Sequence, residues 1–210
     1  MTRLRPVACL AALAVAIAAA PMARAEEDPH AAHHRELAGD APVADRSLYT
    51  ISGTWTDQDG RPFELASLRG GPVVLVLFYG TCDSVCPTIV RDVKKVEASL
   101  AEPDRDRTRF VLVTIDPTVD TPERLLAYAK KNDLDPARWR LLNGDAEQVR
   151  VLANVLGIKY RPTGTGQYSH TIRITVLDRD GVVADHFDGL DRPIEPIAAR
   201  VAALAAAPAK

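Results

Sequence analysis

The sequence has only three cysteines, no cluster of basic residues and no hydrophobic run long enough to cross a bilayer. Lysine and arginine together number 26 against 28 acidic residues, so the formal net charge is −2. A mildly acidic chain without basic clusters is not suited to bind nucleic acid or an anionic membrane surface, and we expect neither as a partner. The apolar run at residues 7–20 is shorter than the ~20 residues that a transmembrane helix needs. The chain also lacks internal repeats, which excludes repeat architectures.

The N-terminal segment has the features of a secretory signal. Arg3 and Arg5 precede the apolar run at residues 7–20, and the small-residue pattern ARA follows at 23–25. This arrangement predicts cleavage after residue 25, and an uncleaved membrane anchor is the alternative. Cys9 lies inside the segment and would leave with it. We therefore expect a periplasmic or otherwise exported protein, which is membrane-anchored only if the segment is retained.

Removal of residues 1–25 changes the formal net charge from −2 to −5, because the segment holds three arginines and no acidic residue. The remaining length suits one domain with its own core. Residues 26–47 are polar and have no sustained apolar period, so we predict a flexible leader followed by a domain at 48–207. The leader contains three histidines that either collect a metal loosely or are simply solvated, namely His30, His33 and His34.

Hydrophobic patterns predict an α/β fold. Asp59-Gly60 between short alternating stretches predicts an N-terminal β-hairpin within residues 53–70. Apolar and β-branched runs predict strands at 72–78, 110–115, 138–142, 172–177 and 182–187, and helical spacing predicts helices at 88–100, 121–132, 146–156 and 197–207. The first two of these strands are continuously apolar, which is typical of strands covered on both faces. Together the elements predict a mixed central sheet with flanking helices.

Two cysteines, Cys82 and Cys86, lie where a buried strand gives way to a helix. Their i, i+4 spacing would place both sulfurs on one face of the first helical turns. A helix start offers N–H groups and a positive dipole that stabilise a thiolate. In an exported protein such a pair forms a disulfide unless something reduces it or holds it on a metal. The pattern therefore indicates a redox dithiol or a metal site rather than two inert buried cysteines.

A histidine stands where a third ligand is needed. The order of elements is that of the thioredoxin superfamily, in which a cis-proline enters the late strand beside the cysteines. In this chain the corresponding segment reads QYSHT at 167–171 and carries His170 instead. Two thiolates and one imidazole favour Cu(I), whereas structural zinc usually takes four ligands and no fourth is evident nearby. A core or surface histidine without a ligand role is the alternative for His170.

Three sequence blocks resemble one known family. VVLVLFYGTCDSVCPTIV resembles its strand, CxxxCP motif and helix start, VTIDPTVDTPERLLAYAK resembles its Asp-Pro…Asp-Thr-Pro segment, and QYSHTIRITVLDRDGVV resembles its histidine-bearing strand entry. The chain thereby resembles the Sco/SenC family of copper-binding, thioredoxin-fold proteins that serve cytochrome c oxidase assembly. The blocks lie between residue 53 and about residue 190, so the resemblance implies a thioredoxin-like fold for nearly the whole domain.

The resemblance also implies a site and a function. It assigns metal ligands to Cys82, Cys86 and His170, with Cu(I) as the cargo and Cu(II) as a further candidate. Its paired acidic positions match Asp116 and Asp120, which either add an oxygen ligand or a partner contact, or only cap a turn and a helix. The implied function is a periplasmic copper chaperone. Its partners would be a copper-accepting oxidase subunit and other periplasmic copper or thiol proteins.

A thiol-disulfide oxidoreductase is the second hypothesis. The same cysteine pair could reduce the cysteines of the oxidase copper site or of another exported protein, with Cys82 attacking because it is nearer the helix start. The chain departs from the family at two points, since residues 83–85 lack a proline and Val119 replaces a common arginine. Neither departure removes a ligand, but because of them the resemblance does not define the surface that a partner would contact.

Overall fold

The computed structural model describes residues 47–164 and 166–207. The predicted signal segment and the three histidines of the leader lie outside these residues, so the structure does not test them. Within the described ranges, no helix combines the length and the hydrophobicity that a membrane span requires.

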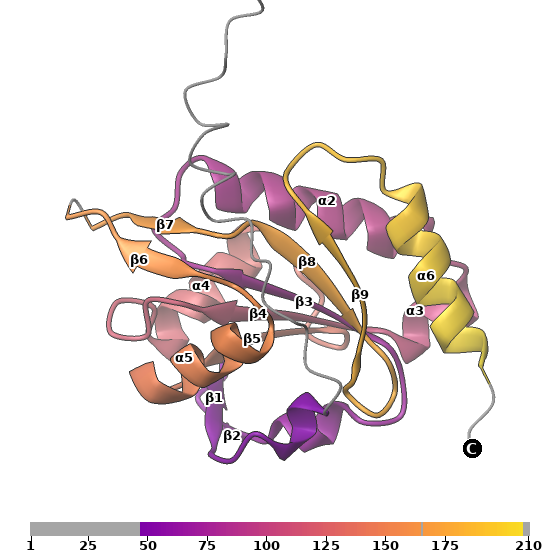
Figure 1. Ribbon diagram of the computed structural model, residues 1–210, viewed down its shortest axis with the longest axis horizontal. Coiled ribbons are helices and arrows are strands. Elements are labelled where there is room, and N and C mark those ends of the chain that lie inside the picture. Colours follow the sequence, from indigo (N-terminus) through magenta and orange to yellow (C-terminus); the bar gives the residue numbers. More distant parts are fainter. Residues whose placement is uncertain (1–46, 165, 208–210) are drawn as a thin grey trace, which may run out of the picture.

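A seven-stranded mixed sheet forms the centre of the domain (Figure 1). Its strands are, in spatial order, β2 (Pro62–Phe63), β1 (Trp55–Asp57), β5 (Trp139–Asn143), β4 (Arg109–Thr114), β3 (Val73–Phe78), β8 (Arg173–Leu177) and β9 (Val183–Asp188). The strands β5, β4 and β3 run parallel, and every other neighbouring pair is antiparallel. The structure thus confirms the predicted mixed sheet and the N-terminal hairpin, which is β1–β2.

Five described helices accompany the sheet: α2 (Val85–Ser99), α3 (Glu102–Arg107), α4 (Pro122–Lys131), α5 (Ala146–Val155) and α6 (Glu195–Ala206). The last helix packs against α2 and α3, and α4 packs beside β5 (Figure 1). Two short 3₁₀ helices, Leu48–Thr50 and Leu65–Leu68, flank the N-terminal hairpin. The sequence did not predict α3, because none of its six residues is buried and it therefore carries no apolar period.

The continuous apolar runs lie where the sequence placed them. Every residue of β3 is buried, and β4 is buried after its first residue. Phe110 of β4 stacks on Trp139 of β5 with ring centroids 5.0 Å apart. Strand β3 is therefore held in the core on both of its faces. The segment that carries the two cysteines begins just after the last residue of this strand.

Strand β8 is buried throughout although its sequence alternates apolar with polar residues. Arg173 is only 2% exposed. Its guanidinium forms a two-pronged ion pair with Asp188 (Nε–Oδ1 2.6 Å, Nη2–Oδ2 2.8 Å) and donates a third bond to the Leu156 carbonyl at 2.9 Å. Because an opposite charge and three hydrogen bonds compensate the guanidinium, a charged residue is tolerated in the core.

A second, two-stranded sheet was not predicted. It consists of β6 (Tyr160–Pro162) and β7 (Tyr168–His170), which pair antiparallel with Tyr160 opposite His170. This hairpin projects from the molecule at the end where α2 begins (Figure 1). The predicted histidine position is therefore the last residue of a hairpin strand, three residues before β8.

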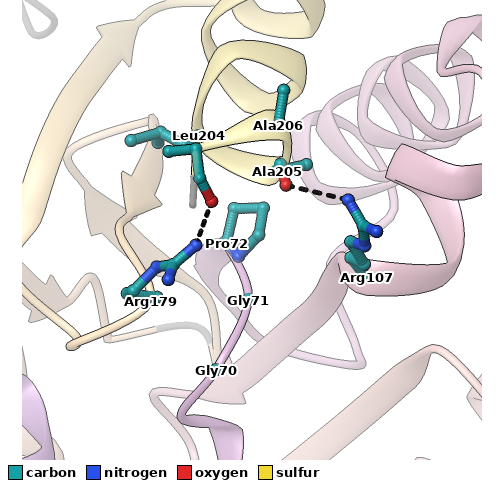
Figure 2. A pocket seen from close by; sticks show the side chains of 9 residues that line it. Gly70, Gly71, Pro72, Arg107, Arg179, Leu204, Ala205 and Ala206 are labelled. Atoms are coloured by element: carbon teal, nitrogen blue, oxygen red, sulfur yellow. Dashed lines mark hydrogen bonds between the residues drawn. The ribbon is translucent and has the colours of Figure 1, made fainter. Parts of the chain in front are cut away.

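A cavity of about 390 Å³ lies by the first residues of β3 and the last turn of α6 (Figure 2). Two arginines line it, and each donates to a carbonyl oxygen at the end of α6: Arg107 to Ala205 at 3.3 Å, and Arg179 to Ala207. These arginines satisfy carbonyls that have no partner within the helix. The cavity lies at the start of β3, whereas the cysteine motif follows its end, so it is not part of the cysteine site.

Candidate metal centre

Strand β3 delivers the cysteine motif to the start of α2. Cys82 lies in the loop between these elements, and its N–H donates to the Tyr79 carbonyl at 3.2 Å. Cys86 lies in the first turn of α2, which begins at Val85 and thus three residues before the predicted start. The expectation that both sulfurs project from helical turns is wrong for Cys82, because Cys82 lies in the loop before α2 begins.

The two cysteines nevertheless meet. The Cys86 N–H, which has no helical partner in the first turn, donates to the Cys82 Sγ at 3.3 Å. Both thiols are free and buried. Hydrogen bonding from the Cys86 thiol and from backbone N–H groups outweighs the opposing effect of burial and lowers the pKa of Cys82 to about 4. The bond to Cys82 and burial raise the pKa of Cys86. In the reduced protein Cys82 is therefore the thiolate and Cys86 keeps its proton.

His170 ends strand β7 and is buried. Its Nδ1 lies 3.0 Å from the Thr171 carbonyl oxygen. Because a carbonyl can only accept, this contact places the imidazole proton on Nδ1 and leaves the lone pair on Nε2, the form in which a histidine binds a metal. The ring meets the Tyr79 ring edge-on, with centroids 6.1 Å apart.

Tyr79 connects the cysteine loop to the histidine hairpin. Its hydroxyl donates to Gln167 Oε1 at 2.8 Å, and its ring contacts Tyr168 with centroids 5.3 Å apart. Sequence reasoning missed this residue. An aromatic residue directly after a buried strand and three positions before Cys82 was visible, but nothing in the sequence indicated that its partners lie almost ninety residues later.

The acidic pair lies at the same end of the sheet. The Asp120 carboxylate accepts the Gly80 N–H at 2.8 Å and the Thr114 hydroxyl. A Cβ at Gly80 would lie 2.7 Å from Asp120 Oδ1, so the close approach requires glycine. Burial raises the pKa of Asp120. Asp120 thus supports the loop that carries Cys82.

Asp116 has a different neighbour. Its carboxylate accepts the Thr118 hydroxyl at 3.1 Å. Burial, and after it the Asp116 carboxylate, raise the pKa of Tyr168 in the histidine hairpin. The first contact lies within the turn that follows β4 and the second reaches the histidine hairpin. Both the capping role of Asp116 and a metal or partner role for the acidic pair stay predictions.

Across residues 47–164 and 166–207, no three His, Cys, Asp or Glu side chains are arranged so that they could hold a metal ion. The structure brings Cys82 and Cys86 together, and it places His170 against Tyr79. The three-ligand set is therefore a prediction that requires the imidazole to approach the sulfurs.

Comparison with known proteins identifies the family. The SCO1/SenC family model matches residues 45–206. The chain belongs to this family. A SCO1 protein homolog of Bacillus subtilis is 24% identical over 141 residues, which cover 66% of this chain and 72% of that protein.

Solved structures of SCO1/SenC proteins share the fold. Bradyrhizobium japonicum ScoI, solved with copper bound, is 30% identical with a TM-score of 0.60, and the match covers 72% of this chain and 96% of ScoI. A family lipoprotein from Bacillus anthracis is 28% identical with a TM-score of 0.67, over 73% of this chain and 92% of that one. The predicted thioredoxin-like fold is thus confirmed.

Proposed function

We propose that this SCO1/SenC protein binds copper through Cys82, Cys86 and His170 and delivers it to the copper centre of cytochrome c oxidase during assembly. One observation carries the proposal: two adjacent thiols at the start of α2 are linked, through Tyr79, to the hairpin that carries His170. Membership in the family and the copper-bound structure of a relative with 30% identity support it.

The donor set suits Cu(I) as cargo. Thiolate sulfur is the soft ligand that Cu(I) prefers, and one imidazole completes a low-coordinate set. Cys82 has a lowered pKa and offers its sulfur without further proton loss. Cys86 has a raised pKa and keeps its proton, so binding of copper by the Cys86 sulfur would release a proton. His170 already has its proton on Nδ1, away from the nitrogen that would bind.

The surroundings of the cysteines suit transfer by ligand exchange. The sulfur-bearing residues are buried, but Thr81, Asp83, Ser84 and Pro87 between and beside them are exposed. An incoming thiolate on a partner can therefore reach this loop. A bond from copper to the incoming sulfur forms before a bond to Cys82 or Cys86 breaks, so the cargo passes on without a change in oxidation state.

Anaerobic competition for Cu(I) against a coloured chelator tests the ligand set in the reduced protein. We expect one copper per chain, loss of tight binding in Cys82→Ser and Cys86→Ser, and at least about tenfold weaker binding in His170→Ala. His186→Ala is the matched control, because His186 is exposed on β9. Affinity in His170→Ala equal to that of the control would show that His170 is not a ligand.

The unequal pKa values of the two thiols favour a second candidate, a thiol-disulfide oxidoreductase. The Cys82 thiolate would attack a target disulfide, form a mixed disulfide and release one target thiolate. Deprotonated Cys86 would then attack Cys82, which oxidises the pair and releases the second, now reduced, target sulfur. The test uses cells that produce only the variant in which both Cys82 and Cys86 are replaced by serine. Rescue of oxidase assembly by added copper favours the chaperone, and rescue by added reductant favours the oxidoreductase.

A further inference from the structure

We propose that Tyr79 is a positioning residue that sets how closely His170 approaches the two cysteines. The proposal rests on the function proposed above, in which Cys82, Cys86 and His170 bind copper. Tyr79 itself binds no metal. It acts through contacts with the cysteine loop on one side and with the β6–β7 hairpin on the other.

On the cysteine side, Tyr79 is part of the buried core. It follows directly after β3, which pairs with β4 on one side and β8 on the other. The residue is 3% exposed, and its carbonyl accepts the Cys82 N–H at 3.2 Å. The turn that carries Cys82 therefore starts from a residue whose backbone the central sheet fixes.

On the histidine side, Tyr79 makes three contacts with one short segment. Its hydroxyl donates to Gln167 at 2.8 Å, and its ring packs on Tyr168 at 5.3 Å and on His170 at 6.1 Å between centroids. Tyr168 and His170 are two positions apart in β7, so they project to the same side of the strand. One ring thus spans the face of the hairpin that carries the imidazole.

The hairpin depends on such contacts. Strands β6 and β7 have three residues each and form their own sheet, separate from the central one. An isolated two-stranded hairpin is at best marginally stable in water. Contacts with the domain must therefore fix the hairpin, and Tyr79 supplies a hydrogen bond and two ring contacts. Preorganised ligands bind more tightly because less freedom is lost on binding.

Amide hydrogen exchange in the reduced, metal-free full chain tests the positional part of the proposal. Tyr79→Phe keeps the ring and removes the hydroxyl bond. We expect the amides of residues 160–170 to exchange about three- to tenfold faster, which corresponds to one neutral hydrogen bond, while β3 and β4 are unchanged. Tyr128→Phe is the control, since the Tyr128 hydroxyl has no hydrogen-bond partner among the described residues and its ring packs on Phe78.

The same variants in the Cu(I) competition assay test the link to binding. We expect about three- to tenfold weaker binding in Tyr79→Phe and in Gln167→Leu, which removes the same bond from its other end. The double variant should bind no more weakly than Tyr79→Phe alone, because the hydroxyl that donates to Gln167 is already absent from Tyr79→Phe. Thermal unfolding and near-ultraviolet circular dichroism should show that Tyr79→Phe retains the fold.

Two results would overturn the proposal. Unchanged amide exchange of residues 160–170 in Tyr79→Phe would show that the hydroxyl does not hold the hairpin, regardless of the copper affinity of that variant. Faster exchange with unchanged copper affinity would reduce Tyr79 to a structural contact. Failure of the proposed function gives a different result. His170→Ala would then bind copper as tightly as the parent, while amide exchange in Tyr79→Phe would still show that Tyr79 holds the hairpin. In that case His170 is not a ligand, and the positioning role of Tyr79 is wrong as well.

Discussion

At the scale of single residues, place in the chain decides the chemistry of two identical side chains. Cys82 lies in a loop and accepts the Cys86 N–H, whereas Cys86 lies in the first turn of α2. The first therefore has a lowered pKa and the second a raised pKa. This asymmetry provides one sulfur that is ready to bind or attack and one that must first lose a proton.

The lowered pKa of Cys82 predicts how stability depends on pH in the reduced, metal-free protein. The pKa falls from an ordinary value of 9.0 to about 4 on folding, so the folded state releases this proton more readily. Its contribution is complete above pH 9, declines as the pH falls and is absent near pH 4. From pH 5 to pH 8 we expect the free energy of unfolding to rise more steeply in the parent than in Cys82→Ser.

Denaturant unfolding in excess phosphine reductant measures this difference. Subtraction of the Cys82→Ser curve removes the contributions of carboxylates that both proteins share. Parallel curves between pH 5 and pH 8 would contradict the assignment of Cys82 as the thiolate. Alkylation by iodoacetamide at pH 6 provides an independent reading, in which Cys82 should react and Cys86 should not.

At the scale of elements, β8 connects the site to the core. It pairs with β3, which leads to the cysteines, and it follows the hairpin that carries His170. Arg173, at its first position, bonds across to β9 through Asp188 and back to the Leu156 carbonyl at the end of α5. One buried guanidinium therefore joins three elements next to the histidine hairpin.

Arg173→Met tests the contribution of this ion pair. Removal of the guanidinium leaves a buried carbonyl and a half-buried carboxylate without their donor, so we expect a loss of about 2–4 kcal/mol in the free energy of unfolding. Arg150→Met is the matched control, because Arg150 pairs with Glu147 while both side chains are exposed. It should change the free energy of unfolding much less than Arg173→Met does, because solvent screens an exposed ion pair. Equal losses in urea unfolding would show that burial does not strengthen the Arg173 pair.

At the scale of the whole molecule, the family match covers nearly all the described residues, and export stays a prediction. The function proposed here requires a compartment in which copper is passed between proteins. Expression of the full chain with fractionation and intact-mass measurement tests this. We expect a periplasmic species that begins at Glu26, because the pattern ARA at 23–25 is typical of signal cleavage. A species that retains residues 1–25 in the membrane fraction would identify an anchor instead.

Particular residues show how far the sequence could lead. The strands at 72–78 and 110–115 were predictable because continuous apolar runs have one stable environment, a sheet covered on both faces. The start of α2 was predicted three residues late, since its first three residues, Val85, Cys86 and Pro87, are too few to show a helical apolar period. The hairpin β6–β7 was missed because its segments are too short to show a period.

The sequence by itself determined the α/β order, the position of the cysteine pair between a strand and a helix, and the resemblance carried by three motifs, because these depend on local patterns. Only the tertiary structure decided that Tyr79 joins the cysteine loop to Gln167 and His170, that Asp120 supports Gly80, and that the two thiols differ in pKa. Each of these depends on side chains or backbone groups that folding brings together, and local sequence patterns do not predict such contacts.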